Sequence, residues 1–206
     1  TSKINYRLKE ARKQRIFWAY TLTLAMSALL ITAITFHILS VFEIGNYSKE
    51  YAVSVFLPTA VVSVVLNFAG SWLADYIKLS VFLFLHLFGM ILSSFSVILI
   101  QQNLDWGMQI MILGNGISGG MFGILMSLTW PRFFGTKYLG EISGFAMSFM
   151  VAGSALGPFI FSGAQSLFGN YNAAAIFSVI LLISIGILSF RIRNINAAGG
   201  NLSLLP

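Results

Sequence analysis

The chain has 206 residues, of which 57% are hydrophobic and only 9% are charged, and its formal net charge is +6. A soluble domain carries about 25% charged residues to wet its surface, so this composition excludes an ordinary water-soluble fold and indicates an integral membrane protein. The absence of cysteine excludes disulfides, thiolate catalysis and cysteine-based metal sites. We expect no cofactor and no metal.

Six of the twelve basic residues stand before the first apolar segment: Lys3, Arg7, Lys9, Arg12, Lys13 and Arg15. This grouping favours a segment that faces anionic lipid headgroups over a surface that reads nucleic acid. Residues 1–15 are therefore predicted to be a cytoplasmic basic linker, with the lipid bilayer and not nucleic acid as a partner. Because the sequence begins with Thr1 and not Met, we expect it to be a segment of a longer protein.

Six apolar segments follow, and each exceeds the roughly 20 residues that cross a bilayer core. In chain order they are 16–42, 51–75, 79–101, 107–131, 140–168 and 171–191. Polar residues, Gly and Asn separate them, as is typical of loops. The sequence predicts an all-α integral membrane fold with a six-helix transmembrane bundle over 16–191 and a cytoplasmic tail over 192–206.

The basic residues also predict the orientation of these spans. With the N-terminus in the cytoplasm, 11 of the 12 Lys and Arg residues lie inside and only Lys49 lies outside, as the positive-inside rule requires. Both termini would then be cytoplasmic, in a multi-pass protein of the plasma or inner membrane. The four tryptophans fall near the ends of predicted spans, where an indole can sit at the level of the headgroups; they are Trp18, Trp72, Trp106 and Trp130.

Away from their ends, the six segments carry no Asp, Glu, Lys or Arg, so they offer no carboxylate relay and no cationic anion site. The ionisable side chains there are two histidines. His37, near the outer end of the first segment, is either an interfacial histidine or a ligand for substrate or protons. His86 has only apolar neighbours, and we expect a structural role for it.

Small residues recur four positions apart in the fourth and fifth segments, in the pairs Gly116 and Gly120, Gly119 and Gly123, Gly140 and Gly144, and Gly153 and Gly157. Such spacing lets two helices approach closely in a membrane. The contact could be static packing, or the sliding contact that a moving transporter needs. Pro58 and Pro158 stand inside segments and free backbone carbonyls there, either as hinges or as tolerated kinks.

One short motif points to an enzyme. Residues 116–119, Gly-Ile-Ser-Gly, match the Gly-x-Ser-Gly of rhomboid-type intramembrane serine proteases, which also have a six-helix core. That chemistry needs a histidine base beside Ser118, because a serine without a base is a weak nucleophile. The last segment, which supplies this histidine in that family, contains none. We expect the chain not to be an enzyme, and the protease stays the less favoured alternative.

Two motifs carry a resemblance to a known family. Residues 70–78, Gly-Ser-Trp-Leu-Ala-Asp-Tyr-Ile-Lys, resemble the Gly-x-Leu-Ala-Asp signature of the short cytoplasmic loop in major facilitator superfamily transporters. Residues 153–158, Gly-Ser-Ala-Leu-Gly-Pro, followed by Gly163, resemble the glycine-proline motif of that family's helix five or eleven. With the basic segment before the first span, the chain resembles helices seven to twelve, the C-terminal half. Residues 36–45 resemble the end of helix seven in monocarboxylate-type and oxalate/formate-type members.

The resemblance implies a secondary active transporter of a small solute, in which this bundle rocks against an N-terminal six-helix half around a central site. Spans one, two, four and five would face the cavity. The polar residues near the middle or mouth of those spans are the candidate substrate-binding residues: His37, Thr59, Ser63, Asn67, Asn115, Ser118, Ser148 and Ser154. The motif residues Gly70, Asp75, Gly153, Gly157 and Pro158 would serve conformational change. A non-transporting membrane accessory subunit is the main alternative.

Overall fold

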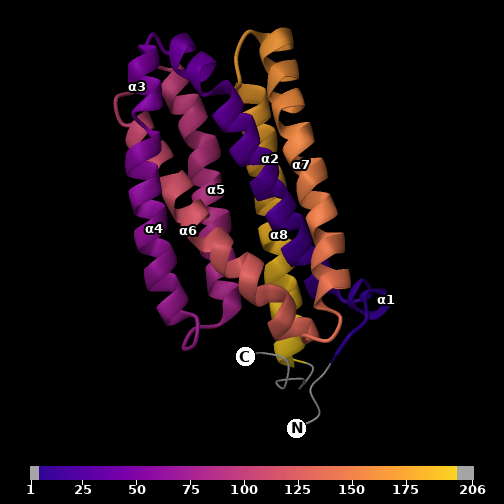
Figure 1. Ribbon diagram of the computed structural model, residues 1–206. Coiled ribbons are helices and arrows are strands. Elements are labelled where there is room, and N and C mark those ends of the chain that lie inside the picture. Colours follow the sequence, from indigo (N-terminus) through magenta and orange to yellow (C-terminus); the bar gives the residue numbers. More distant parts are fainter. Residues whose placement is uncertain (1–4, 199–206) are drawn as a thin grey trace.

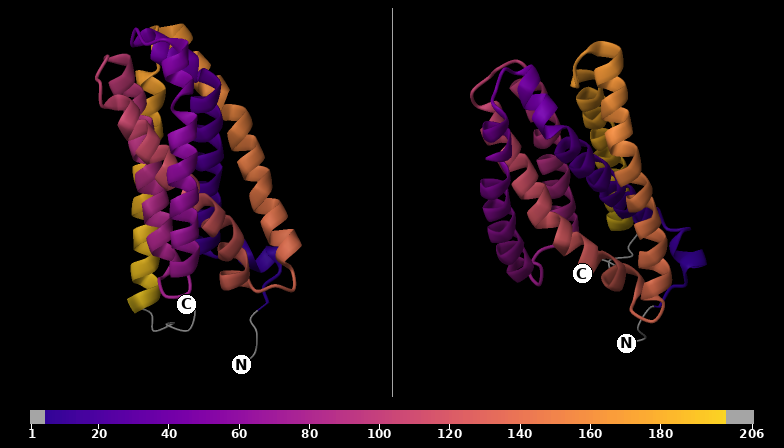
Figure 2. Two further views of the ribbon diagram at one scale, coloured as in Figure 1. Left: turned by 60° about the vertical axis from the view of Figure 1, so that its left-hand side comes forward. Right: turned by 45° about the horizontal axis from the view of Figure 1, so that its top comes forward.

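The computed structural model describes residues 5–198 as a bundle of long helices, with no strand in that range (Figure 1). The helices run up and down between a base, where α2 begins, and a top, where α2 ends (Figures 1 and 2). The predicted linker residues 1–4 and tail residues 199–206 lie outside the described residues. The helices are α1 Leu8–Ala11, α2 Arg15–Ile44, α3 Lys49–Val53, α4 Phe56–Leu73, α5 Leu79–Gln101, α6 Gly107–Phe134, α7 Leu139–Phe168 and α8 Asn172–Ala198.

Six helical spans between residues 15 and 191 are long and apolar enough to cross a membrane, which confirms the predicted six-helix fold. They are α2, α3 with α4, α5, α6, α7 and the part of α8 up to Arg191. The spans begin and end within a few residues of the predicted segments.

The main differences from the predicted spans lie at two prolines, Pro58 and Pro131. The second span is divided into α3 and α4 around Ser54 and Val55. Pro58 has no N–H to donate to the carbonyl of Ser54, so the helix is interrupted where that hydrogen bond would form. The fourth span continues through Pro131 to Phe134, whereas the sequence predicted its end at residue 131.

The helices pair in a pattern that relates the two halves of the bundle. α2 packs along α7, α4 packs along α6, and α5 contacts both α6 and α8. The first span therefore pairs with the fifth, the second with the fourth and the third with the sixth. Span two of one half thus packs on span one of the other half, in both directions: α4 on α6, and α7 on α2. We call these two contacts the exchanged pairs. Such pairs are expected when spans one to three and four to six are two copies of a three-helix unit, as in transporters built from internal repeats.

Glycines bring the backbones of both exchanged pairs close together. A side chain at Gly153 or Gly157 of α7 would collide with the carbonyl oxygens of Ala25 and Leu29 on α2. On the other pair, a Cβ at Gly120 of α6 would lie 2.9 Å from the carbonyl oxygen of Ser63 on α4. These glycines are needed for the approach of the two backbones, as small residues are in membrane helix pairs.

The pair Gly140 and Gly144 behaves differently, because nothing lies within 4 Å of a Cβ built at either position. These two glycines do not pack helices together within the part of the chain that the structure describes. They lie on the free side of α7, the side that no other described helix covers.

The tryptophans follow the interfacial expectation only in part. Trp72 and Trp106 lie near helix ends and are 69% and 51% exposed, and the indole N–H of Trp18 donates to the carbonyl of Arg12 at 2.8 Å. Trp130 is instead 1% exposed, inside the base of the bundle. Its ring lies 5.5 Å from that of Phe17, centroid to centroid. Trp130 is thus a core residue and not an interfacial anchor.

The base of the bundle is closed by α6 and by the segment that precedes α2. Figure 1 shows α6 running obliquely from beside α4 and α5 to the foot of α7. There the N–H of Tyr6 donates to the carbonyl of Phe134 at 3.0 Å. The guanidinium of Arg7 lies 4.9 Å from the centre of the Tyr138 ring, in the loop between α6 and α7. The basic segment is therefore docked on the fold from residue 5 onward.

Candidate functional site

Two pockets lie between α2, α4, α5 and α6 and share three lining residues, Ile31, Asn115 and Gly119. The larger has a volume of about 320 Å³ and is lined by Ser27, Ala28, Leu30, Ile31, Thr32, Met90, Ser93, Asn115, Ser118, Gly119 and Phe122. The smaller has a volume of about 210 Å³ and is lined by Ile31, Ile34, Thr35, Ile38, Val55, Phe56, Thr59, Ala60, Ser63, Asn115 and Gly119. Neither lining contains an acidic, basic or histidine side chain.

The structure brings four of the eight predicted cavity residues together here. Thr59 and Ser63 reach the smaller pocket from α4, and Ser118 reaches the larger one from α6. Asn115 lines both pockets. Gly119 is part of the shared wall because a glycine there admits Ser63, whose hydroxyl would lie 2.7 Å from a Cβ at position 119.

The amide of Asn115 is held from behind by a buried serine. Ser93 on α5 is 2% exposed, and its hydroxyl donates to Oδ1 of Asn115 over 2.6 Å. The Asn115 side chain makes no other hydrogen bond to the described residues, so its two N–H groups have no acceptor among them. The pocket wall therefore presents hydrogen-bond donors at Asn115.

The other four predicted residues lie outside both pockets. The amide of Asn67 donates to the carbonyl of Gly120 at 2.9 Å and so joins α4 to α6. The hydroxyls of Ser148 and Ser154 donate within α7, to Phe145 and Val151, at 2.7 and 2.9 Å. His37 lies at a junction of three helices, described next.

His37 joins α2 to α7 and to the start of α8. Its Nε2 lies 3.1 Å from the carbonyl oxygen of Pro158, and its Nδ1 lies 3.1 Å from the hydroxyl of Tyr171. A carbonyl can only accept, so Nε2 carries the proton and Nδ1 accepts from Tyr171. Both ring nitrogens of a neutral histidine are thereby satisfied, and the ring stacks on the buried Phe161.

Pro158 leaves one carbonyl of α7 without its usual donor, and α2 supplies a replacement. Because proline has no N–H, the carbonyl of Ser154 lacks its partner within the helix. The hydroxyl oxygen of Thr32 on α2 lies 3.0 Å from that carbonyl and 2.7 Å from the carbonyl of Ala28, so its proton is shared between them. Thr32 also lines the larger pocket, which connects the pocket wall to the kink in α7.

Four polar lining residues were missed in the sequence: Ser27, Thr32 and Thr35 on α2, and Ser93 on α5. Ser27, Ile31 and Thr35 are spaced four residues apart, so they share one face of a helix, and this spacing could have identified the α2 wall. Ser93 offered no such signal, because its place in the pocket wall depends on the packing of α5 against α6, where it contacts Asn115.

The structure places His86 beside Ser118, although the sequence predicted no histidine base there. The contact does not activate the serine. Nδ1 of His86 lies 2.9 Å from the backbone carbonyl of Ser118 and 3.4 Å from its hydroxyl. The carbonyl requires a proton on Nδ1, so this nitrogen cannot also accept one from the hydroxyl. Nε2 is buried without a hydrogen-bond partner. The geometry supplies no general base for Ser118.

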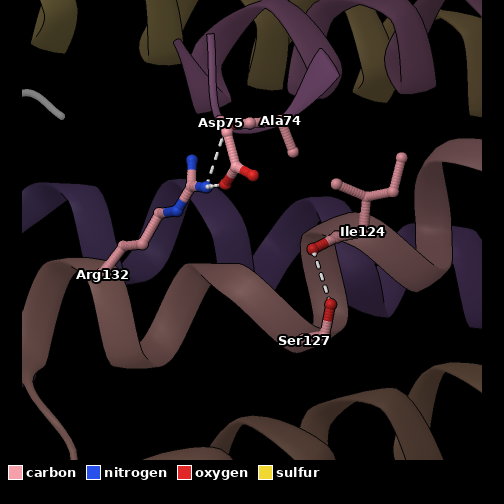
Figure 3. A network of polar contacts seen from close by, with 5 residues as sticks. All are labelled: Ala74, Asp75, Ile124, Ser127 and Arg132. Atoms are coloured by element: carbon pink, nitrogen blue, oxygen red, sulfur yellow. Dashed lines mark hydrogen bonds and ion pairs between the residues drawn. The ribbon is translucent and has the colours of Figure 1, made fainter. Parts of the chain in front are cut away.

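At the base, the predicted motif residues meet the end of α6 (Figure 3). The guanidinium of Arg132 donates to the carbonyl of Ala74 at 2.9 Å and lies 3.7 Å from the carboxylate of Asp75. The Asp75 side chain is 84% exposed, so the ion pair contributes little stability by itself. At Gly70 a Cβ would lie 2.5 Å from Cδ1 of Ile124, so this glycine admits α6 against α4. Both contacts tie the turn after α4 to α6.

Comparison with known proteins decides the family. The family model described as Major Facilitator Superfamily matches residues 1–158, which is most of the chain. The chain belongs to the major facilitator superfamily. No curated protein and no solved structure matched it.

Membership in the major facilitator superfamily identifies the chain as a multi-pass membrane protein of a transporter family. It also supports the resemblance that was drawn from residues 70–78 and 153–158, the first of which lies within the match and the second at its end. In this major facilitator chain the motif residues lie at helix contacts, and the two pockets lie between the helices that these contacts hold.

Proposed function

We propose that the chain is the C-terminal half, helices seven to twelve, of a secondary active transporter that moves a small solute by alternating access. The pair of pockets on α2, α4 and α6 is the observation that carries the proposal, because a carrier needs a solute site inside its spans. The exchanged helix pairing, with glycines at both close contacts, supports a bundle that can move as one body.

In this proposal the base is cytoplasmic, since the docked basic segment and Arg132 gather there, and the top faces outward. His37, Thr59, Ser63, Asn67, Asn115, Ser118, Ser148 and Ser154 remain the candidate substrate-binding residues, of which Thr59, Ser63, Asn115 and Ser118 line the pockets. Gly70, Asp75, Gly153, Gly157 and Pro158 would carry conformational change, and Thr32 links this set to the pocket.

The free side of α7 supports an N-terminal six-helix partner. Small residues take several exposed positions along one face, where the larger Val151 and Phe159 lie among them; the small residues are Gly140, Gly144, Ser148, Ala155 and Ser162. The exposed residues of α8 are mostly bulky and apolar, among them Ile176, Ile180, Ile183 and Ile187. Lipid suits the second surface, whereas small residues favour close contact with another helix. The accessory-subunit alternative would share such a surface but would not need the pockets.

A monocarboxylate or oxalate/formate specificity, suggested by residues 36–45, would require a cation near the solute. The pockets contain no such group within this half. If the solute is an anion, its charge must be met by the partner half.

A matched pair of serines tests the partner surface. Ser148 on α7 and Ser184 on α8 are both exposed, and each donates its hydroxyl within its own helix. Ser148→Leu should weaken the association of this bundle with the N-terminal half, because leucine would separate the two helices. Ser184→Leu should have no effect, because it faces lipid. Retention of the two halves on a column, after cleavage of a protease site inserted ahead of the docked segment that begins at residue 5, measures this.

Equal retention for both leucine variants would contradict the partner surface on α7. If Ser148→Leu and Ser184→Leu weakened the association of the two halves to the same extent, the effect would come from the added leucine and not from its position. That result would also contradict the partner surface.

A further inference from the structure

The pockets contain polar groups whose hydrogen-bonding capacity the described chain does not use. Thr59 lines the smaller pocket, and its hydroxyl oxygen is buried without a hydrogen-bond partner among the described residues. The two N–H groups of Asn115 have no protein acceptor, because Ser93 occupies the carbonyl oxygen of that amide. Asn115 is half-buried and lines both pockets, so its N–H groups are available to an acceptor that enters them, and a donor that stays without one in a largely apolar site costs free energy.

The remaining wall of the pockets is apolar and uncharged. Ile31, Ile34, Ile38, Phe56 and Phe122 supply most of its larger side chains. An ionised group placed there would lose its hydration without gaining a counter-ion from this half, which is expensive in a membrane interior. An uncharged oxygen acceptor would instead satisfy Asn115 at no such cost.

We propose that the pocket shared by α2, α4 and α6 binds an uncharged solute with an apolar body and a carbonyl or ether oxygen, and that the Asn115 amide donates to this oxygen. Ser93 is a positioning residue, since it fixes which side of the amide faces the pocket. This inference rests on the proposed function for the identity of the site and adds the chemical class of its occupant.

Four small aromatic probes of similar size test this class. Acetophenone carries a carbonyl acceptor, ethylbenzene carries none, benzoate is an anion and benzylammonium is a cation. This chain has no cysteine, so a Ser63→Cys variant places one reporter thiol on the pocket wall once any cysteine of the N-terminal half has been replaced by serine. The rate at which N-ethylmaleimide modifies this thiol is measured in the full-length protein with increasing amounts of each probe. Thr35→Cys is a second reporter in the same pocket, and Thr136→Cys, in the loop at the base, is the control thiol.

Acetophenone should slow the labelling of both pocket thiols at about three- to ten-fold lower concentration than ethylbenzene, as one hydrogen bond predicts. Benzoate and benzylammonium should not protect them, and no probe should protect Thr136→Cys. Asn115→Leu should remove the advantage of acetophenone and leave the protection by ethylbenzene unchanged.

The role of Ser93 is tested by selectivity and not by stability. Ser93→Ala should reduce the preference for acetophenone over ethylbenzene, because the amide of Asn115 can then turn its oxygen toward the pocket. Ser94→Ala is the matched control, since the buried Ser94 hydroxyl has no hydrogen-bond partner. If Ser93→Ala and Ser94→Ala changed the preference for acetophenone over ethylbenzene to the same extent, the positioning role of Ser93 would be overturned.

Equal protection by acetophenone and ethylbenzene, or stronger protection by benzoate or benzylammonium, would overturn the proposed class. This outcome is separable from the failure of transport. A chain that selects acetophenone but exposes its pocket to only one side of the membrane would keep this inference and contradict the proposed function.

Discussion

Gly157→Leu is expected to prevent the bundle from folding. At this position the backbones of α7 and α2 approach so closely that any side chain would collide with the carbonyl oxygen of Leu29. That oxygen belongs to a helix backbone and cannot rotate away, so the two helices would have to separate and lose their shared packing. We expect a loss of about 4 kcal/mol or more, which is a large part of the roughly 5–15 kcal/mol that stabilises a folded protein. The recovery of monodisperse protein in mild detergent, followed by its thermal unfolding, measures this.

Gly163→Leu is the matched control on the same helix, because nothing lies within 4 Å of a Cβ at Gly163. It should be recovered at the level of the unmodified chain. Normal folding of Gly157→Leu would show that the close contact between α2 and α7 does not hold the bundle together.

Removal of the His37 side chain should produce the second largest loss. His37→Leu leaves the hydroxyl of Tyr171 without its acceptor and removes the donor that α2 supplies to the carbonyl of Pro158, at the junction of α2, α7 and α8. A hydroxyl that stays buried without a hydrogen-bond partner costs about 1–3 kcal/mol. A single hydrogen bond between membrane helices contributes about 0.6 kcal/mol on average. We expect the free energy of unfolding to fall by about 1–3 kcal/mol, as measured by reversible unfolding in SDS.

A double-mutant cycle with Tyr171→Phe isolates the contact between the two side chains. The double variant should lose less stability than the sum of the two single losses. Phe36→Leu, at the exposed neighbouring position, should change stability little. Exact additivity of His37→Leu and Tyr171→Phe would contradict the hydrogen bond that is described here.

The fold could be predicted from the sequence because the bilayer allows few solutions. Length and hydropathy predict six spans, and the structure confirms them. The break before Pro58 and the continuation of α6 through Pro131 could not be predicted from the sequence. A proline interrupts a helix only where neighbouring contacts do not compensate for the lost hydrogen bond. Trp130 was misjudged for a related reason: its position near a span end did not reveal that α6 turns under the bundle.

The candidate site was predicted only in part. Polarity in the middle of a span identified Thr59, Ser63, Asn115 and Ser118, which line the pockets. Polarity alone could not distinguish them from Asn67, whose amide joins two helices, or from His37, whose ring nitrogens are both engaged. That distinction depends on the direction of each side chain and on the pairing between helices far apart in sequence. The contact of Ser93 with Asn115 is of the same kind.

The central claim is that the pockets form a site that opens to each side of the membrane in turn. Labelling of Ser63→Cys in the full-length protein by a membrane-impermeant maleimide tests it most directly, with the reagent applied separately to each face of sealed vesicles. The account predicts labelling from both faces, while the lipid-facing Ser184→Cys stays unlabelled from either. Labelling of Ser63→Cys from one face alone, or from neither, would contradict it.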